Sequence, residues 1–569
     1  MLGIHSRTVL PARLFGAVTA LLVGVFASAS LAAVPAAPPA PQGMSAVIVH
    51  GEAGAMAQLE RSVVRSGGTV IRELKIIEGF SATVPAAQLG ALRALPGVAS
   101  IIEDAPLSFH SDYSPAADPY SMANTAIGVG ASTAWAEGIT GAGVDVAVVD
   151  SGVSPVQGLA GEGKVVNGPD LSLDSQNAST QYLDGFGHGT FMAGLIGAKD
   201  PGADLGAPGS AYLGMAPDAR IVNIKVGSNN GTVDVSQVIA GIDWVVQHRH
   251  DNGLNIRVLN LSLGTNSSQS YQVDPLAFAA EVAWRAGIVV VAAAGNSGAA
   301  NGHLDDPASD PFVIAVGAAG SSGTGSLNNL LVAAFSSLGN GTRNPDLVAP
   351  GSHLQGLRVP GSYIDQNFSS AAFGNRFFRG SGTSEAAALT SGAVALILQK
   401  RPSLKPGQVK AILAQTAAAL PNVAVQAQGA GFLQVAAGVD DALSVPSGWQ
   451  GFWPSVGNGS LEKSRGSGHV TIGGAQLTGE QDIFGHPFSS SQHASQSANG
   501  QGWSDGGWNG TTWSGTTWSG TTWSGTTWSG TTWLGTTWSG TTWSGTTWSG
   551  TTWSGTTWSS DLWSDYSWS

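Results

Sequence analysis

Nearly continuous apolar segments recur through the middle of the chain and alternate with segments of helical periodicity. Runs of this kind, without polar alternation, are typical of parallel strands that are covered on both faces. They occupy residues 145–149, 221–226, 258–263, 288–294 and 312–316. Between two of them, Val235, Val238, Ile239, Ile242 and Val246 share one face of a helix. The pattern predicts an α/β fold built on a doubly wound parallel sheet.

Three short strings carry residues suited to nucleophilic catalysis. They are VVDSG with Asp150, GHGT with His188 and GSGTS with Ser384. A serine hydroxyl becomes a nucleophile when a histidine accepts its proton and a carboxylate fixes the tautomer of that histidine. Ser384 also precedes an apolar helical segment, whose N-terminus favours developing negative charge. Taken singly, the three residues would be a turn aspartate, a surface histidine and a helix N-cap.

A fourth string, VVVAAAGN, ends at Asn296, between the histidine and the serine. The order Asp, His, Ser, with this asparagine between the last two, resembles the subtilisin-like serine proteases. The resemblance implies Ser384 as nucleophile, His188 as base, Asp150 as its orienting carboxylate and Asn296 as the donor to the oxyanion. The related sedolisins use other residues in place of the histidine and the asparagine, so the chain is not expected to be one of them.

The segment that follows the serine departs from the family pattern. Subtilisins usually continue Gly-Thr-Ser with Met-Ala, a small residue and Pro, whereas this chain continues with Glu385 and three alanines. The change removes no catalytic atom, but it alters the polarity beside the nucleophile and leaves the specificity open.

The resemblance also implies a place for an extended peptide substrate. Ser262, Leu263 and Gly264 would form a strand edge to which the substrate adds main-chain hydrogen bonds. Ala294 and Gly295 would complete the S1 pocket, which holds the side chain before the scissile bond. These five residues are the expected substrate-binding residues.

Two acidic residues, Asp305 and Asp306, align approximately with the base of that pocket. Many relatives carry small or aromatic residues there. One hypothesis is a partial preference for Lys or Arg at P1, the substrate residue before the scissile bond. The alternative is that both are surface acids in a loop.

The charge and cysteine content exclude several classes of protein. The net charge is −13, without long runs of like charge, which argues against a nucleic-acid partner and is consistent with simple solubility. The chain has no cysteine, so disulfides, thiolate metal sites and a cysteine nucleophile are excluded. Structural calcium is implied by the resemblance, but the sequence shows no ligand cluster, and no cofactor or metal ligand is assigned.

The N-terminus has the pattern of a secretory signal. Arg7 and Arg13 precede an apolar run at residues 14–31 and small residues suited to signal-peptidase cleavage. A membrane anchor is the alternative, but the run is marginal for spanning a bilayer, and an Ala/Pro-rich stretch follows it. We expect an extracellular protein.

Residues 44–110 have a pattern of their own. Their apolar runs and helical segments follow the order β-α-β-β-α-β, which is ferredoxin-like. The segment resembles the inhibitory propeptide of secreted subtilisins, which assists folding, occupies the cleft and is removed autocatalytically, here between residues 105 and 118. An unrelated small α+β domain is the alternative.

The C-terminal residues form a repeat in which Trp recurs every fifth position from Trp503 to Trp568, mostly as TTWSG. Period five fits neither a helix nor a strand, since successive Trp side chains would change face. A stacked solenoid and a flexible spacer are both open. We favour a ladder that binds a surface, with cell-wall polysaccharide as the expected partner, because Trp faces suit sugar rings.

These observations predict a secreted serine endopeptidase that hydrolyses peptide bonds through an acyl-enzyme and is made as a zymogen inhibited by its own propeptide. The alternative is a catalytically idle cell-wall or surface-binding protein that acts through the tail. The predicted divisions are a signal peptide (1–33), a linker (34–43), the propeptide (44–110), the catalytic domain (118–444), a Gly/Ser-rich linker (445–500) and the repeat tail (501–569).

Overall fold

The computed structural model describes residues 43–52, 54–104, 114–176, 179–320, 330–472, 475–504, 507–509, 511–517, 522–529, 531–533 and 536–538. The predicted signal peptide, nearly all of the first linker, the end of the predicted propeptide and the repeat tail beyond residue 538 lie outside these residues. The chain divides into two compact units, residues 1–110 and 111–569. Within the described residues, no helix combines the length and apolar character needed to cross a membrane.

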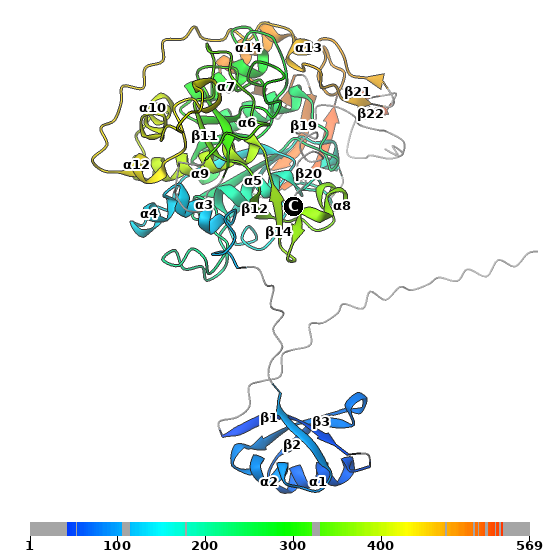
Figure 1. Ribbon diagram of the computed structural model, residues 1–569. Helices are drawn as coiled ribbons and strands as arrows, with labels where there is room; N and C mark the ends of the chain where they lie inside the picture. The colour runs from blue at the N-terminus through cyan, green and yellow to red at the C-terminus, as the bar shows by residue number, and fades with distance from the viewer. Residues whose placement is uncertain are drawn as a thin grey trace, which may run out of the picture. The chain divides into compact units, whose positions relative to one another are not determined.

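The first unit is a four-stranded antiparallel sheet with two helices (Figure 1). Its elements are β1 (Met44–Gly51), α1 (Met56–Arg65), β2 (Thr69–Leu74), β3 (Gly79–Pro85), α2 (Leu89–Arg93) and β4 (Val98–Glu103). The strand order is β2-β3-β1-β4. Alternate residues of β1 and β3, such as Val47, Val49 and Phe80, meet Leu59 and Val63 of α1 in a small apolar core. The spacing of Leu59 and Val63 places both on one face of the helix.

The second unit contains a seven-stranded parallel sheet (Figure 1). Its strands are β5 (Asp145–Asp150), β6 (Val165–Asp170), β7 (Arg220–Lys225), β8 (Ile256–Leu261), β9 (Val289–Ala293), β10 (Ile314–Ala319) and β11 (Leu347–Pro350). Their order is β11-β10-β9-β8-β5-β7-β6, so the winding reverses at β5. The doubly wound α/β fold is therefore confirmed, and β5, β8 and β9 end near the crevice where such sheets bind ligands.

Two of the seven strands did not stand out in the sequence. The strand β6 contains Gly168 and Pro169 and lies at the edge of the sheet, where these residues are tolerated. The strand β11 is only four residues long and ends in Pro350. The five strands predicted from apolar runs are all present, with ends shifted by a few residues.

Pairs of helices pack together on the sheet. The main helices are α5 (His188–Gly197), α6 (Val235–His248), α7 (Pro275–Arg285), α9 (Thr383–Lys400) and α10 (Pro406–Thr416). The buried helices α5 and α9 contact each other, and α9 crosses β8 to β11; α6 and α7 form a second pair. Asp234 caps α6 by accepting from the N–H of Ser236, and Asp274 caps α7 in the same way.

Smaller elements flank this framework. They are α3 (Met122–Gly128), α4 (Ala131–Ala136), α8 (Tyr363–Asn367), α11 (Val425–Gln428), α12 (Val435–Val439), and β12 (Leu354–Leu357), β13 (Ala372–Phe373) and β14 (Phe377–Gly380). The last three form a small antiparallel sheet that leads directly into α9.

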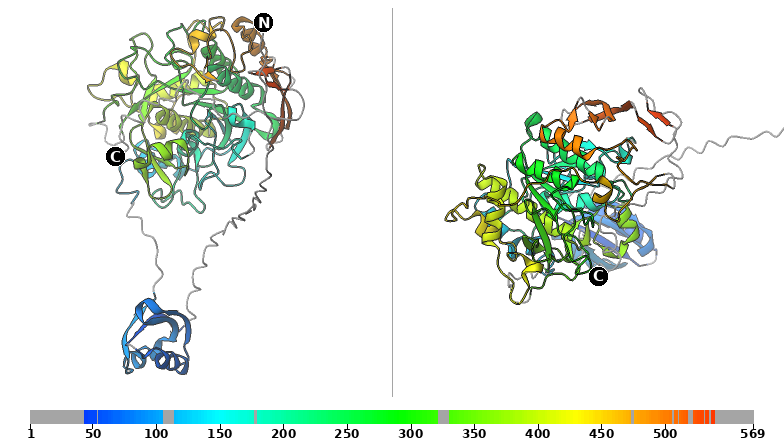
Figure 2. Two further views of the ribbon diagram at one scale, coloured as in Figure 1. Left: turned by 90° about the vertical axis from the view of Figure 1, so that its right-hand side faces the viewer. Right: turned by 90° about the horizontal axis from the view of Figure 1, so that it is seen from above.

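The described part of residues 447–509, which we call the C-terminal wrap, lies over α6 and α7 (Figure 2). It contains α13 (Leu461–Ser464), the hairpin β15 (Thr471–Ile472) and β16 (Ala475–Gln476), and α14 (Ser490–Ala498). Arg465 is fully buried, and its Nε donates to Asp234 at 2.7 Å. The segment predicted as a Gly/Ser-rich linker is thus packed, through scattered apolar side chains such as Leu461 and Phe488 as well as through polar contacts.

The wrap continues into the start of the Trp repeat. Trp503 and Trp508 are buried, the backbone N–H and C=O of Trp503 pair with the side chain of Gln247, and the indole N–H of Trp508 donates to Asp243 at 2.8 Å. The following strands are β17 (Trp503–Ser504), β18 (Gly507–Trp508), β19 (Thr511–Thr517), β20 (Thr522–Ser529), β21 (Thr531–Trp533) and β22 (Thr536–Trp538). They pair as antiparallel hairpins, with Trp513 opposite Trp528, and not as the parallel coils of a stacked solenoid.

Candidate active site

Asp150 and His188 meet at the point where the winding of the sheet reverses. Asp150 ends β5 and His188 begins α5, and each is only 1% exposed. The Nδ1 of His188 lies 2.8 Å from Oδ1 and 3.0 Å from Oδ2 of Asp150. The sequence prediction placed these residues in separate strings, and the structure brings them into direct contact.

Asp184 supports this pair, although the sequence analysis did not single it out. Its Oδ1 accepts from the hydroxyl of Ser151 at 2.8 Å and from the N–H of Gly187 at 2.6 Å. Its Oδ2 accepts from the N–H of Thr190 at 2.7 Å. One buried carboxylate therefore fixes the first turn of α5 and the residue after Asp150. The only local signal was an aspartate four residues before the histidine.

The protonation of His188 depends on the charges around it. Burial lowers the pKa of the imidazole, but the charge and hydrogen bond of Asp150 raise it more, with smaller contributions from Glu385 and Asp184. The net pKa is above the ordinary value of 6.5. The surroundings therefore stabilise the imidazolium, which is the species that a general base forms when it accepts a proton.

Ser384 stands in the first turn of α9 and is held against the end of β8. Its hydroxyl donates to the carbonyl of Ser262 at 2.9 Å, and the hydroxyl of Ser262 donates to the carbonyl of Ser384 at 2.9 Å. Asn260 fixes Ser262 through a further hydrogen bond of 2.9 Å. The serine is 4% exposed, so its position is set by β8 as much as by α9.

Asn296 follows β9 and faces the same turn of α9. Its Oδ1 accepts from the backbone N–H of Thr383 at 2.9 Å and from the Thr383 hydroxyl at 3.0 Å. The Thr383 hydroxyl oxygen in turn accepts from the N–H of Gly295 at 3.1 Å. Because Oδ1 is committed to Thr383, the amide NH₂ of Asn296 points away from that residue, and its nitrogen lies 3.5 Å from where a Cβ at Gly382 would stand. Thr383 is a positioning residue that the sequence analysis did not single out.

Glu385, the departure from the family pattern, is buried beside the nucleophile. Its side chain occupies space left by two glycines, since a Cβ at Gly380 or Gly382 would lie 2.5 Å or 2.7 Å from its carboxylate oxygens. The residue is 1% exposed, and its Oε1 has no hydrogen-bond partner among the described residues. Burial raises the pKa of this carboxyl from 4.5 to about 7, while the charge on His188 lowers it.

The expected substrate-binding residues lie together at the ends of β8 and β9. Ser262 and Ala294 are buried, whereas Leu263 and Gly264 are half-buried and continue irregularly from β8. The N–H of Ala294 donates to Val316 of the neighbouring strand at 3.0 Å. These residues form two short walls on the side of the sheet where Ser384 stands.

Asp305 and Asp306 have different surroundings. Asp306 is fully buried, burial and the neighbouring Asp274 raise its pKa well above the ordinary value, and Ser309 donates to it. Asp305 is half-buried and lies against Gly264 and Gly295, the two glycines among the expected pocket residues. The sequence analysis grouped the two residues, but only Asp305 lies against the glycines of the expected pocket.

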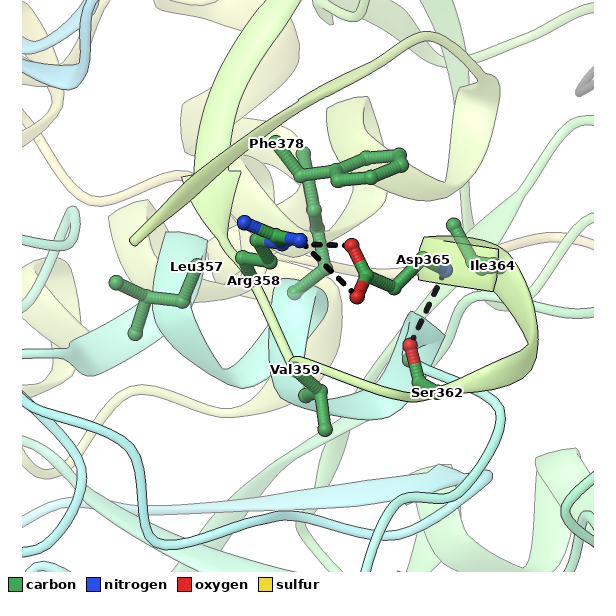
Figure 3. A pocket seen from close by; sticks show the side chains of 9 residues that line it. Leu357, Arg358, Val359, Ser362, Ile364, Asp365 and Phe378 are labelled. Carbon is green, nitrogen blue, oxygen red and sulfur yellow. Dashed lines mark hydrogen bonds and ion pairs between the residues drawn. The ribbon is translucent and has the colours of Figure 1, made fainter. Parts of the chain in front are cut away.

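A small hollow borders the start of α5 (Figure 3). Arg358 and Asp365 point toward each other at this hollow, with Nε and Oδ1 2.6 Å apart. Most of the other lining side chains are apolar. The lining residues are Gly187, Phe191, Leu357, Arg358, Val359, Ser362, Ile364, Asp365 and Phe378. Because Gly187 directly precedes His188, the hollow offers apolar contact surface next to the catalytic candidates.

The described residues do not gather a set of metal ligands. No group of three or more Asp, Glu or His side chains within them is arranged to hold a metal ion. Calcium also binds backbone and amide oxygens, so the structural calcium that the resemblance implies stays a prediction, and no chemical step is assigned to a metal.

Comparison with known proteins is consistent with this geometry. A family model described as the Subtilase family matches residues 141–432. Serine protease AprX of Bacillus subtilis (strain 168) is 40% identical over 282 residues, which are 48% of this chain and 61% of that protease, so the match spans less than two thirds of its length. Subtilisin NAT of Bacillus subtilis subsp. natto is 30% identical over 382 residues, 66% of this chain and 84% of that protein. An alkaline protease of Shouchella clausii is 32% identical over 362 residues, with shares of 63% and 79%.

Proposed function

The chain belongs to the subtilase family of subtilisin-like serine endopeptidases, and on that premise we propose that it hydrolyses peptide bonds outside the cell through an acyl-enzyme on Ser384. The observation that carries the proposal is the direct contact between Asp150 and His188, at 2.8 Å, together with a serine at the start of α9. An orienting carboxylate, a base and a nucleophile are the three parts that such a reaction needs.

The proposed mechanism assigns a step to each of these groups. The hydroxyl of Ser384 leaves the carbonyl of Ser262 and donates to Nε2 of His188. The Oγ attacks the substrate carbonyl as its proton passes to Nε2, and Asp150 stabilises the imidazolium at Nδ1. His188 then gives this proton to the leaving amine, and the acyl group stays on Ser384. A water molecule attacks the acyl-enzyme while His188 accepts its proton, and the proton returns to the Ser384 oxygen as the acid product leaves.

We assign stabilisation of the oxyanion to Asn296 and the N-terminus of α9. The amide of Asn296 is turned away from Thr383, and the backbone N–H of Ser384 lies in the first turn of the helix. Two donors fixed before the reaction begins stabilise developing charge without reorganisation.

Labelling with a fluorophosphonate tests the proposal. The secreted protein should become covalently labelled at Ser384, because the reagent needs an activated serine hydroxyl. The Ser384→Ala variant should not be labelled, whereas Ser381→Ala, three residues earlier in the same string, should be. A folded wild-type protein that stays unlabelled after loss of residues 44–110 would favour the idle surface-binding protein instead.

We further propose that residues 44–110 inhibit the enzyme and are removed by it. The support is a separate compact unit with its own apolar core, at the position of an inhibitory propeptide. Wild-type protein should lose this unit during secretion, and Ser384→Ala should retain it. Loss of the unit from both proteins in a protease-free host would contradict self-processing.

For the repeat tail we propose binding to cell-wall polysaccharide. The support is the density of Trp in the TTWSG repeats, whose ring faces suit sugars. A chain that ends at Asn509 keeps the C-terminal wrap and lacks most repeats, so it should keep activity and lose retention on purified cell wall. Equal retention of both chains would contradict this role.

A further inference from the structure

The segment around Asp305 joins the two walls of the expected S1 pocket. The N–H of Asp305 donates to the carbonyl of Ala294 at 3.0 Å, on the wall that follows β9. Asp306 exchanges two hydrogen bonds with Thr265, of 2.8 Å and 2.9 Å, on the wall that follows β8. Because it is bonded to both walls, this segment holds Asp305 between them.

The carboxyl group of Asp305 lies directly on glycine backbone. A Cβ at Gly295 would stand 2.5 Å from its carboxyl carbon and within 2.8 Å of both oxygens. A Cβ at Gly264 would stand 3.1 Å from the Cβ of Asp305. Because Gly264 and Gly295 have no side chains, the side chain of Asp305 can occupy the space between the segments that follow β8 and β9. Gly295 also has φ of +104°, which an L side chain rarely adopts.

This carboxyl group lacks a complete set of partners. Its Oδ1 is buried and has no hydrogen-bond partner among the described residues. Burial raises its pKa to about 7, and a hydrogen bond from Asn301 offsets this only in part. No charged side chain in the described part of the chain contributes to that shift. An unpaired carboxylate in such a place is costly unless a ligand supplies the missing cation.

We propose that Asp305 is the specificity-determining residue at the base of the S1 pocket and that the enzyme cleaves preferentially after Arg or Lys. A guanidinium or ammonium group at P1 would pair with the carboxylate of Asp305 and satisfy its buried oxygen. An apolar P1 side chain would leave that oxygen unpaired and bring its own surface against a charge. The inference deepens the proposed function and rests on it.

Peptide substrates that differ only at P1 test the proposal. The mature full-length enzyme is given tetrapeptide p-nitroanilides with Arg, citrulline or Leu before the scissile bond. Citrulline has the shape of Arg without its charge, so the Arg/citrulline ratio of kcat/KM isolates the ion pair. Because truncating one partner of a buried charge pair costs 2 kcal/mol or more, we expect a ratio of at least about thirtyfold at pH 8.

The Asp305→Asn variant should bring the Arg/citrulline ratio close to one while cleaving the Leu substrate as well as, or better than, the wild type. The matched control is Asp441→Asn, which removes one negative charge from a side chain that is 81% exposed and should leave the ratio unchanged. Fluorophosphonate labelling of each variant shows that its cleft is folded and reactive. The Asp305→Glu variant, which keeps the charge, should retain a preference for Arg.

The outcomes separate this inference from the proposed function. Cleavage of Leu and Arg substrates at equal rates by a labelled enzyme, unaltered in Asp305→Asn, would overturn the specificity and leave the proteolytic activity standing. Absence of both labelling and cleavage would overturn the proposed function itself. A ratio that falls equally in Asp441→Asn would show a general charge effect and would also overturn the assignment to Asp305.

Discussion

Buried carboxyl groups at the cleft and on the face covered by the C-terminal wrap differ in whether their oxygens have partners. On the wrapped face, buried carboxyl groups have partners across the two segments, as Asp234 has in Arg465 and Asp243 has in His493. At the cleft, the carboxyl groups of Glu385 and Asp305 each have a buried oxygen without a partner in the described residues. Buried polar atoms in folded proteins almost always have a hydrogen-bond partner, and those that lack one are often found at functional sites. We therefore expect a bound ligand or a proton to supply the missing partner of each of these two carboxyl groups.

The packing of the C-terminal wrap could not be predicted from its amino-acid composition. The wrap has few apolar residues in helical or strand periodicity, and it is attached by scattered apolar side chains such as Phe488 and by single polar contacts such as the 2.9 Å bond between Trp284 Nε1 and Gln450. Such contacts join residues far apart in the sequence and leave no local pattern. Its role in the stability of the second unit is therefore open to direct tests.

The largest effect should come from breaking the buried pair on the wrapped face. Arg465→Ala leaves Asp234 buried and unpaired at the start of α6, so we expect a loss of about 3–5 kcal/mol in the free energy of unfolding. Denaturant unfolding in a Ser384→Ala background, which prevents self-digestion, measures it. Lys400→Ala breaks an exposed pair with Asp441 and should cost below about 1 kcal/mol. Equal losses of unfolding free energy in both variants would show that the buried pair stabilises the protein no more than the exposed pair does.

The second effect belongs to the cleft and should appear in catalysis. Asn296→Ala removes the proposed oxyanion donor, so kcat should fall by about a hundred- to a thousandfold with little change in KM. Steady-state kinetics on a good peptide substrate measure both constants. Asn499→Ala is the control, because that exposed side chain donates to the carbonyl of Ser495 in the C-terminal wrap and lies outside the candidate site. A fall in kcat of less than about threefold in Asn296→Ala would remove the asparagine from the mechanism.

A smaller effect on stability should come from the first buried repeats of the tail. Trp508→Phe keeps most of the apolar ring and removes the donor to Asp243, and a hydrogen bond to a charged group contributes about 1.5 kcal/mol or more. Thermal unfolding of the Ser384→Ala protein measures the loss. Trp449→Phe changes a side chain that is 83% exposed and should be neutral. If both are neutral, the hydrogen bond from Trp508 to Asp243 does not stabilise the wrap.

The sequence predicted those parts of the molecule whose signal is local. The strand runs, the strings around Asp150, His188 and Ser384, and the apolar run before Asn296 each lie within a few residues, and they allowed the fold class and the candidate site to be inferred. Asp184 and Thr383 could not be found in this way, because their importance lies in which backbone N–H groups they hold across the fold. The separation of Asp305 from Asp306 likewise depends on the register between the segments after β8 and β9.

The last prediction, and the sharpest test of the comparison, concerns the protonation of Glu385. Its pKa is raised from 4.5 to about 7 chiefly by burial, with the charges of His188 and Asp150 acting in opposite directions. The folded protein therefore holds this proton more tightly than the unfolded chain does. The corresponding stabilisation is complete below pH 4.5 and is lost as the pH rises through about 7.

Glu385→Gln removes this titration and keeps the shape of the side chain. The difference in unfolding free energy between wild type and variant should then change across pH 4.5 to 7, at about 1.4 kcal/mol for each unit by which the pKa is raised. In the active enzyme the same change removes a negative charge that raises the pKa of His188, so the acidic limb of the kcat/KM profile should move to lower pH. A variant whose stability and activity follow the wild-type pH dependence would mean that Glu385 does not titrate across this range and that its unpaired oxygen has a structural role alone.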